Sequence, residues 1–459
     1  MSMKKTVVID VVGLSSGLIG PHTPFLEQYA RKHHVSQIQP MLPAVTTAVQ
    51  STYLTGRWPS EHGIVGNGWY DKTDAEIKFW KQSNHLVDAP KIWDHARSID
   101  PSFTVSQMCW WYNMYASVDF SVTPRPQYLS DGRKLPDCYS HPADLRDRLQ
   151  DKLGTFPLFQ FWGPGANIKS TQWIADASIL TDQWHDPTLT LIYLPHLDYC
   201  LQKFGHDMSK VGPELQAVDK VVEQLIRYYE SKGAAIIVLS EYGITPVNNP
   251  IHINRLLRKE GLINVRVERG TELLDAGASR AFAVADHQVA HVYINDKDRA
   301  TYRKICELLE ATPGIEKVLD REGKQTHELY HERAGDLVAV ADRNSWFTYY
   351  YWEDDARAPD FARIVDIHRK PGYDPVEMFL NPADPLVKLK VVGKLIKKKL
   401  GFRYLMDVIP LDATLIKGSH GRLTEDPAWQ PVLITGKPQA AAIPATGVYD
   451  VIWQQLVRE

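Results

Sequence analysis

The sequence has few cysteines, no long apolar run and little excess charge, and each of these absences excludes a class of protein. Its four cysteines are scattered and form no CxxC pair, which excludes a disulfide scaffold and a thiolate zinc knuckle. No stretch approaches the roughly 20 apolar residues of a membrane-spanning helix. The formal net charge of −3 argues against a general nucleic-acid binder, which would normally be basic. With 44% hydrophobic and 23% charged residues, the composition is that of a soluble enzyme.

The N-terminus resembles a signal peptide in having two lysines before an apolar run. Asp10 in the middle of this run argues against that interpretation, because the apolar part of a signal peptide carries no charge. Residues 5–10 instead have the pattern of a buried first strand of a parallel sheet, with Asp10 at its carboxyl end. The sequence therefore predicts a cytoplasmic protein.

Three further apolar runs end in a side chain that can bind a metal. They cover residues 188–199, 233–243 and 412–421, and they end in Asp198, Glu241 and His420. Parallel sheets bind their ligands at the carboxyl ends of the strands, so we expect these side chains to lie together. A fourth predicted strand, at residues 280–295, carries Asp286, His287 and His291.

Helical patterns separate several of these predicted strands, most clearly at residues 213–233, where apolar residues recur at intervals of three and four. This alternation predicts a doubly wound α/β fold with a mostly parallel central sheet and helices on both faces. Because 459 residues exceed one simple core, we also expect an inserted cap. We assign residues 1–330 to the first part of the core, 331–408 to the cap and 409–459 to the return of the core.

Residues 42–70 are the most informative stretch of the chain. A loop led by Pro43 is followed by Thr46 and Thr47 and then by a helical run that closes at Gly56. At a helix N-terminus, free backbone N–H groups and the positive end of the helix dipole favour both an alkoxide and a phosphate. Threonine is also a common N-cap residue, so this position alone does not indicate catalysis.

The same stretch resembles the nucleophile segment of the type I phosphodiesterase/nucleotide pyrophosphatase family of the alkaline phosphatase superfamily. The family pattern is Pro-x-x-Thr, a helix that ends in Thr-Gly, and then Pro-x-x-His-Gly-Ile-x-x-Asn. The positions that match it are Pro43, Thr46, Thr55-Gly56, Pro59, His62-Gly63-Ile64 and Asn67. The resemblance implies an alkaline phosphatase-like fold with Thr46, rather than Thr47, as the nucleophile. It makes Asn67 a candidate for holding a phosphoryl oxygen, although asparagine is equally suited to a turn.

The resemblance also implies two divalent metal ions, usually zinc and with manganese as an alternative, beside the nucleophile. Two cations about 4 Å apart activate the hydroxyl, clamp the phosphoryl oxygens and stabilise the leaving group. The residues at the implied ligand positions are Asp10, Thr46, Asp198, Gln202, Glu241 and His420.

Two of these positions depart from the family pattern. Gln202 stands where the family has a histidine, and Tyr242 replaces the histidine that follows the family's second aspartate, here Glu241. A phenol is a rare ligand because it must first lose its proton. We regard His287 as the candidate for the missing imidazole, although a buried histidine satisfied by hydrogen bonds is as common. The other histidines that could supply this metal ligand are His196, His206 and His368.

The function implied by the resemblance is metal-dependent hydrolysis of phosphodiester or pyrophosphate bonds through a phosphothreonyl or nucleotidyl-threonyl intermediate. Three alternatives stay open: a phosphonoacetate hydrolase-like activity, a phosphomonoesterase, and a non-catalytic protein that binds a phosphorylated ligand. The expected substrate is small, either nucleotide-like or an isoprenoid or lipid phosphate. The sequence also leaves open whether the protein forms a homodimer.

Two segments of the predicted cap carry further hypotheses. The aromatic run at residues 346–352 is typical either of a substrate pocket or of hairpin core packing, and His368 to Lys370 suit an anionic substrate. A second aromatic segment, residues 109–115, is a candidate cover for the same cleft. Residues 387–402 are basic with interleaved apolar residues, a pattern of a solvated helix or of a helix that lies on an anionic membrane surface.

Overall fold

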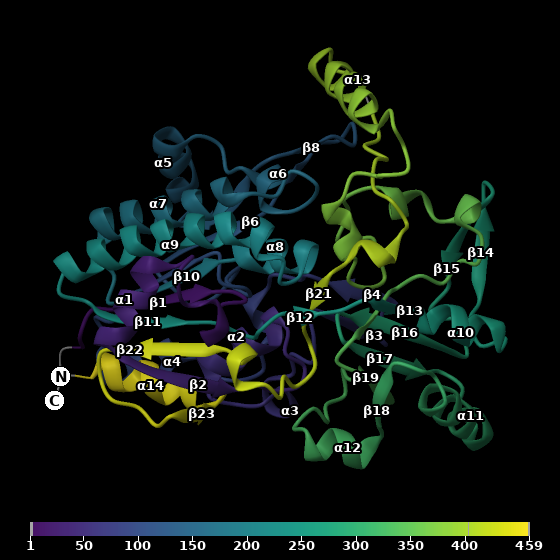
Figure 1. The fold of residues 1–459 in the computed structure, drawn as a ribbon, viewed down its shortest axis with the longest axis horizontal. Coiled ribbons are helices and arrows are strands. Elements are labelled where there is room, and N and C mark those ends of the chain that lie inside the picture. Colours follow the sequence, from purple (N-terminus) through teal and green to yellow (C-terminus); the bar gives the residue numbers. More distant parts are fainter. Residues whose placement is uncertain (1–2, 403, 458–459) are drawn as a thin grey trace.

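The largest unit of the computed structural model, which describes residues 3–402 and 404–457, is a nine-stranded sheet (Figure 1). Its strands in spatial order are β23 (Ala442–Pro444), β2 (His34–Gln39), β22 (Val432–Thr435), β11 (Ala235–Leu239), β1 (Thr6–Val11), β10 (Leu189–Leu194), β5 (Val105–Met108), β6 (Phe120–Pro124) and β9 (Cys138–His141). The five strands from β11 to β6 are parallel, whereas β22 and β9 run antiparallel to their neighbours. The predicted mostly parallel sheet is confirmed.

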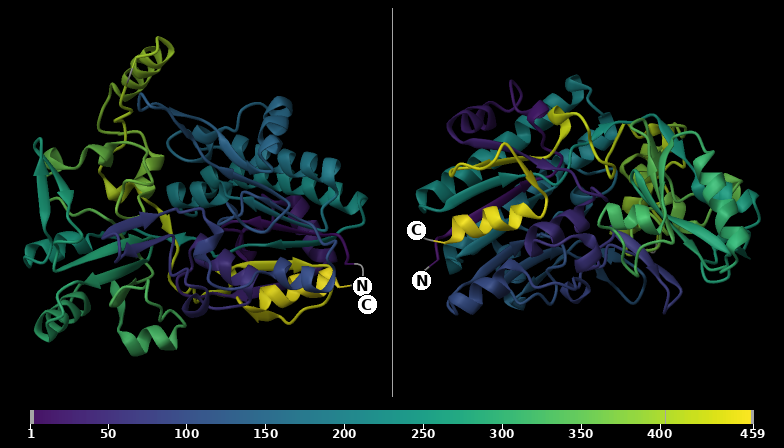
Figure 2. Two further views of the ribbon diagram at one scale, coloured as in Figure 1. Left: turned by 180° about the vertical axis from the view of Figure 1, so that it is seen from behind. Right: turned by 90° about the horizontal axis from the view of Figure 1, so that it is seen from below.

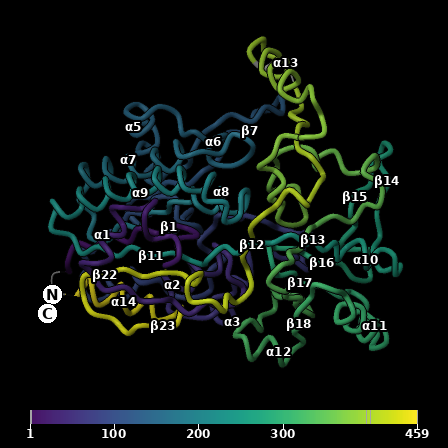
Figure 3. The backbone as a smooth tube through the Cα atoms, viewed as in Figure 1, coloured from purple at the N-terminus to yellow at the C-terminus, as the bar shows by residue number. Residues whose placement is uncertain are grey.

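Helices cover both faces of this sheet (Figure 2). On one face lie α7 (Ile168–His185) and α9 (Met208–Ser231), flanked by α1 (Pro24–Lys32) and α5 (Ala143–Leu153). On the other face lie α14 (Gly447–Leu456), α2 (Thr46–Thr55) and α4 (Ile92–Ile99). The doubly wound arrangement is therefore confirmed. Residues near the two ends of the described chain lie side by side, where the backbone N–H of Lys4 donates to the carbonyl oxygen of Leu456 at 2.7 Å (Figure 3).

Local sequence explains the central elements. Every residue of β1, β10 and β11 is buried, in agreement with their continuous apolar runs. Helix α9 buries an apolar stripe with a spacing of three and four, as predicted. Helix α2 is buried along its whole length and ends at Gly56, whose φ of 65° is left-handed and therefore favours glycine.

A second, antiparallel sheet lies beside the first. Its strands in spatial order are β16 (Ala281–Asp286), β17 (Val289–Ile294), β19 (Leu337–Ala341) and β18 (Ile315–Leu319). The single strand predicted at 280–295 is thus a hairpin, because His287 adopts a φ of 60° and turns the chain. The boundary placed at residue 331 falls between two strands of this sheet. We propose that the inserted part begins soon after β11 and that the core resumes with β22.

Short elements connect these units. The helices near the second sheet are α10 (Ile253–Lys259), α11 (Arg299–Glu310) and α12 (Arg321–Thr326), and α3 (Pro59–His62), α6 (Leu158–Phe161) and α8 (His196–Phe204) belong to connections of the core. Two-stranded sheets pair β3 (Gly68–Asp71) with β4 (Glu76–Phe79), β7 (Gln127–Tyr128) with β8 (Lys134–Leu135), β14 (Val265–Glu268) with β15 (Thr271–Leu274), and β12 (Thr245–Pro246) with β21 (Gly418–Ser419).

The strand predicted at 412–421 is wrong over most of its length. The chain forms a 3₁₀ turn at Ala413–Leu415 and only the two-residue strand β21. This segment passes close over α8: a Cβ at Gly418 would lie 2.3 Å from the carbonyl oxygen of Leu201. The close approach is the reason for a glycine there, and it places His420 beside α8.

The aromatic run at residues 346–352 packs into the core. Each of these side chains is buried, and none of them lines the main cavity described below. Strand β20 (Ser345–Phe347) pairs in parallel with β13 (Asn249–Ile251) and not with β19. The core-packing interpretation of the aromatic run is thus confirmed. The hairpin that it assumed is wrong, because β20 pairs with β13 and not with the preceding strand.

Helix α13 (Val387–Lys399) projects from the body of the molecule (Figure 1). It lies in the last part of the proposed insertion, before the chain returns to the central sheet with β22. Among the described residues, no helix combines the length and the apolar character needed to cross a bilayer.

A buried ion cluster fixes the loop that leads to α13. The ammonium group of Lys370, which is almost fully buried, lies 2.7 Å from Asp374 and 2.8 Å from Glu377. Burial alone would lower the pKa of Lys370, but the two carboxylates raise it, so the side chain stays charged. Glu377 also accepts hydrogen bonds from the indole of Trp162 and the backbone N–H of Asp366.

We expect Lys370→Met to lower the free energy of unfolding by about 3–5 kcal/mol, because it leaves two buried carboxylates without a positively charged partner. The matched control is Lys304→Met, which removes a half-exposed lysine paired with Glu260 and should cost less than about 1 kcal/mol. Denaturant unfolding measures both. Equal effects would show that the cluster does not fix this loop.

Candidate active site

Thr46 is the first residue of α2 and faces a cavity at the carboxyl ends of β1, β10 and β11. Its hydroxyl lies 2.8 Å from the phenol oxygen of Tyr242. The hydroxyl of Thr47 instead donates to the carbonyl oxygen of Gly66 at 2.9 Å and contacts Asn67. Of the two threonines, only Thr46 therefore presents a hydroxyl to the cavity.

Two buried carboxylates lie next to Thr46. Asp10 comes from β1 and Glu241 follows β11, and Gln50 of α2 bridges them. The amide nitrogen of Gln50 donates to Glu241 at 2.6 Å and lies 3.4 Å from Asp10, while its oxygen accepts the backbone N–H of Trp111. One oxygen of each carboxylate, Asp10 Oδ1 and Glu241 Oε2, has no hydrogen-bond partner.

Burial dominates the charge state of this pair. Desolvation raises the pKa of Asp10 to about 7, against the hydrogen bonds from Glu241 and Gln50. Desolvation also raises the pKa of Glu241 well above its usual value, and the nearby Asp10 raises it further. Two carboxylates this close share a proton near neutral pH unless a cation binds between them.

A second pair of ligand-type side chains lies on the other side of Tyr242. Asp198 is in the first turn of α8, and its Oδ1 is 3.5 Å from Nε2 of His420. His420 Nδ1 donates to the carbonyl oxygen of Ala44, so Nε2 is a lone-pair acceptor that faces the carboxylate. Burial raises the pKa of Asp198 to about 7 and lowers that of His420 well below its usual value. Two facing acceptors at this distance suit a shared proton or a cation.

Gln202 and Tyr242 occupy the two positions that depart from the family pattern. Gln202 donates to Asp198 at 3.0 Å and accepts from the phenol of Tyr373 at 3.0 Å. Tyr242 stacks on His420, with ring centroids 3.6 Å apart. Burial and the neighbouring carboxylates Asp198 and Glu241 raise the pKa of its phenol well above the usual value, so Tyr242 stays protonated. It is a hydrogen-bond partner of Thr46.

A chain of hydrogen bonds links Asn67 to His287. Asp286 accepts bonds from the backbone and side-chain N–H groups of Asn67 at 2.8 and 3.0 Å, and from Nδ1 of His287 at 2.8 Å. Because Nδ1–H donates to the carboxylate, Nε2 of His287 is the free proton acceptor. Burial lowers the pKa of His287 well below its usual value, so the ring is neutral. It packs between His420 and Tyr373 and lines the cavity.

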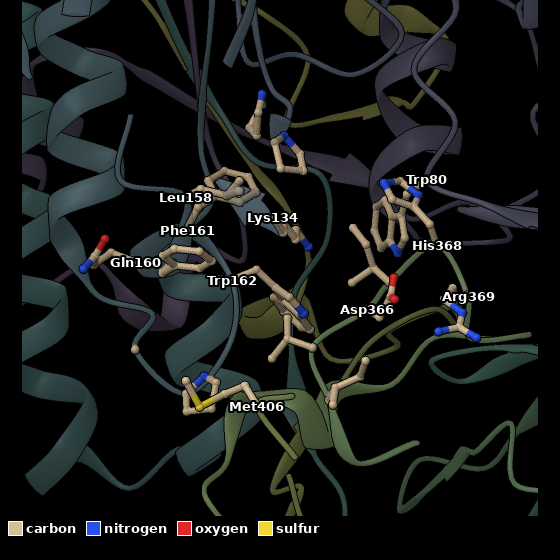
Figure 4. A pocket seen from close by; sticks show the side chains of 18 of the residues that line it. Trp80, Lys134, Leu158, Gln160, Phe161, Trp162, Asp366, His368, Arg369 and Met406 are labelled. Atoms are coloured by element: carbon tan, nitrogen blue, oxygen red, sulfur yellow. The ribbon is translucent and has the colours of Figure 1, made fainter. Parts of the chain in front are cut away.

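The cavity has a volume of about 800 Å³, which is large for a small-molecule site. Its inner end is formed by Thr46, Asp198, Tyr242 and His287. Figure 4 shows part of its wall; the labelled side chains are Trp80, Lys134, Leu158, Gln160, Phe161, Trp162, Asp366, His368, Arg369 and Met406. From the aromatic segment 109–115, Trp111 reaches this wall as expected.

The donor set decides which cations fit the site. Among the described residues, no group of three or more His, Cys, Asp or Glu side chains is arranged to hold a metal ion. Zinc sites use three or four such ligands, so the side chains as arranged do not fit the expected pair of zinc ions. The unpaired oxygens of Asp10 and Glu241 do fit an oxygen-preferring cation such as Mg²⁺ or Mn²⁺, which binds one or two carboxylates and completes its shell with substrate phosphate and water.

All the side chains predicted from sequence thus gather at one end of the cavity, although their roles stay predictions. Asn67 uses both ends of its side chain to connect Thr47 with Asp286. The other histidines serve elsewhere: His196 bonds Glu214, His206 bonds the carbonyl oxygen of Ile244, and His368 lies farther along the cavity.

Three contributors were not predicted as site residues: Gln50, Asp286 and Tyr373. Gln50 lies one helical turn after Thr46, so the spacing of four was a usable signal. Tyr373 lies in an irregular segment, and no local pattern marks it.

The chain is similar in sequence to known proteins. The family model described as type I phosphodiesterase/nucleotide pyrophosphatase matches residues 6–374. A Schizosaccharomyces pombe protein, described as an uncharacterized pyrophosphatase/phosphodiesterase, is 24% identical over 302 residues, which are 64% of this chain and 55% of that protein. An ectonucleotide pyrophosphatase/phosphodiesterase of Caenorhabditis elegans is 19% identical over 310 residues, or 66% and 34% of the two chains. The chain spans about a third to about half of the length of these relatives.

Solved structures show the same fold at low identity. One is murine ectonucleotide pyrophosphatase/phosphodiesterase 5, an inactive threonine-to-alanine variant with AMP, at 16% identity and a TM-score of 0.60, covering 98% of this chain and 94% of that one. Another is the phosphonoacetate hydrolase of Sinorhizobium meliloti with phosphonoacetate, at 16% identity and a TM-score of 0.62, covering 98% and 96%. The likeness shows an alkaline phosphatase-like fold.

We expect Gln50→Leu to destabilise the metal-free protein by about 1–3 kcal/mol, because Asp10, Glu241 and the N–H of Trp111 then lose a buried partner. The measurement is denaturant unfolding in the presence of a chelator. The control Gln172→Leu changes a glutamine on the outer side of α7, bonded to Asp176, and should have a smaller effect. Wild-type stability of Gln50→Leu would contradict the bridging role.

Proposed function

The chain belongs to the type I phosphodiesterase/nucleotide pyrophosphatase family, and on that basis we propose that it hydrolyses phosphodiester or pyrophosphate bonds with Thr46 as the nucleophile. The observation that carries the proposal is the placement of Thr46. Its hydroxyl stands at the N-terminus of a buried helix, faces the cavity, and has the carboxylates of Asp10 and Glu241 on one side and Asp198 on the other.

The named neighbours support a small phosphorylated substrate. The murine protein binds AMP, and the bacterial hydrolase is recorded with phosphonoacetate and with phosphonoformate. The murine variant that carries a threonine-to-alanine change is inactive. This loss of activity is expected when the threonine is the nucleophile. We propose the same class of reaction for this chain, but not those particular ligands.

In the first step, the oxygen of Thr46 bonds to phosphorus as the bond to the leaving oxygen breaks. Glu241, which lies beside Thr46, accepts the proton within its pair with Asp10. Tyr242 donates a hydrogen bond that orients the threonine oxygen toward the cavity. The N-terminal dipole of α2 stabilises the negative charge that develops on the phosphoryl group. The leaving oxygen takes its proton from solvent.

In the second step, a water molecule attacks the phosphothreonyl group. His287 is placed to accept its proton at Nε2, because the bond from Nδ1 to Asp286 fixes the ring and its tautomer. The bond between phosphorus and the oxygen of Thr46 breaks, and the proton held by the pair of Asp10 and Glu241 returns to the threonine. This assignment uses His287 as a base, in place of the metal-ligand role predicted from sequence.

The family is metal-dependent, and we propose that this chain uses an oxygen-preferring divalent cation, Mg²⁺ or Mn²⁺, and not zinc. Asp10 and Glu241 would hold it through their unpaired oxygens, Oδ1 and Oε2, which leaves their other oxygens for the proton of Thr46. A bound cation would polarise phosphoryl oxygens and neutralise their charge. What supports this choice is Tyr242, which stands where the family has a histidine, since the donors of Asp10, Glu241 and Thr46 are all oxygens.

We expect Thr46→Ala to abolish hydrolysis of bis-p-nitrophenyl phosphate, because no other hydroxyl replaces the nucleophile. Thr47→Ala is the matched control: it should lower stability through its lost bonds to Gly66 and Asn67 but retain turnover. Both are assayed by release of p-nitrophenolate with Mn²⁺ present. Turnover in Thr46→Ala, or loss of turnover only in Thr47→Ala, would refute the assignment. An inactive wild-type protein that still binds the diester would favour a binding function.

We expect Gln202→His to create a zinc site, because it adds a third imidazole or carboxylate ligand to Asp198 and His420 on the same side of the cavity. The measurement is zinc per chain after dialysis, which should rise from near zero toward one. Gln172→His is the control, because it adds an imidazole on α7, away from both pairs of ligand-type side chains. Unchanged zinc content in Gln202→His would mean that Asp198 and His420 are not placed as ligands.

A further inference from the structure

Most large exposed apolar side chains of the described protein gather on one segment, residues 386–405. On α13, Leu389, Val392 and Ile396 are 68%, 52% and 54% exposed. Their spacing of three and four residues places them in one stripe along the helix. The stripe continues past the helix with Leu400 and Phe402, which are also exposed. A contiguous exposed apolar surface of this kind marks an interaction site.

Lysines border this stripe on both sides. With about 100° of rotation per residue, Lys388 and Lys399 fall on one side of it and Lys390 and Lys397 on the other. Lys390 pairs with Asp384, whereas no ion pair among the described residues involves Lys388, Lys397 or Lys399. An exposed apolar stripe between lysines is the pattern of a helix that lies in the plane of an anionic membrane surface.

The side of α13 next to this stripe belongs to the cavity of the candidate active site. Val391 and Leu395 of this helix line the cavity, together with Leu405 and Met406 of the segment that follows. The same cavity ends at Thr46. A bound molecule can therefore extend from the nucleophile to α13 without leaving the cavity.

The wall between these two ends is largely apolar and aromatic. It includes Leu158, Phe161, Trp162 and Ile364, and Figure 4 shows the first three lining the space. Basic groups, among them Lys134 and Arg369, lie on the same wall. A cavity of about 800 Å³ with such a wall suits a long apolar chain better than a second polar group.

We propose, resting on the function proposed above, that α13 lies on an anionic membrane surface and that the cavity takes the apolar chain of a phosphoester lipid whose phosphorus reaches Thr46. The lysines beside the stripe favour an anionic membrane over a second copy of the chain as the binding partner of the stripe. Two facing copies of α13 would bring their lysines together, whereas anionic headgroups attract them by about 1 kcal/mol per lysine near the surface.

The docking surface is tested by flotation of the full-length protein with vesicles of phosphatidylcholine, with and without phosphatidylglycerol. We expect the wild-type protein to float with the anionic vesicles only, and the double variant Leu389→Glu/Ile396→Glu to bind them at least about tenfold more weakly. The matched control is Val267→Glu, which changes an equally exposed residue on β14 and should float like the wild type.

Three results of the flotation experiment would overturn the proposal: no flotation of the wild type, equal flotation of both variants, or a dimer by light scattering that the double variant dissociates without any vesicle binding. The last result would assign the stripe to a second copy.

The cavity is tested with two soluble diesters, methyl p-nitrophenyl phosphate and hexadecyl p-nitrophenyl phosphate below its aggregation concentration. Each is cleaved by water to p-nitrophenol and the alkyl phosphate. We expect a KM at least about tenfold lower for the hexadecyl diester, a loss of this preference in Val391→Asp, and the wild-type preference in the control Val267→Glu, which lies outside the cavity. Equal KM values would refute a lipid substrate, whereas failure to cleave either diester would refute the proposed function itself.

Discussion

Burial of carboxylates at the N-terminus of one helix is the constraint on which the site depends. Asp10, Asp198 and Glu241 are buried at the ends of three adjacent parallel strands, and among the described residues no lysine or arginine pairs with them. Such a group is costly unless protons, hydrogen bonds or a cation compensate the charge. The surrounding side chains, above all Gln50, Gln202 and the helix bearing Thr46, supply only part of that compensation. The rest of the negative charge must be compensated by protons or by bound ligands. Buried carboxylates that need such compensation are expected at a binding site.

The two replaced histidines change the site in a coordinated way. Tyr242 supplies a phenol that bonds the nucleophile, and Gln202 supplies an amide that connects Asp198 to Tyr373. Each substitution removes a soft nitrogen donor and adds a neutral hydrogen-bonding group. Meanwhile His287 enters from the second sheet with its tautomer set by Asp286. The second sheet therefore contributes a side chain to the cavity at the strand ends.

Sequence predicted most of the core because its signals are local. The buried run of β1, the spacing of α9 and the left-handed Gly56 each depend on a few neighbouring residues, and all three appear as expected. The predicted strand at 280–295 failed because a histidine with a positive φ turns the chain, and residue type alone does not reveal that turn. The partners of Asp286 and Gln202 come from distant segments, so no spacing along the chain could identify them.

The most direct test of the account is to trap the covalent intermediate. The protein would be mixed with bis-p-nitrophenyl phosphate, quenched in acid within milliseconds to seconds, digested and sequenced by tandem mass spectrometry. The account predicts a p-nitrophenyl phosphate ester on the side chain of Thr46, formed at the rate of the first release of p-nitrophenolate. Turnover with no adduct on any residue, or an adduct on another residue, would contradict it.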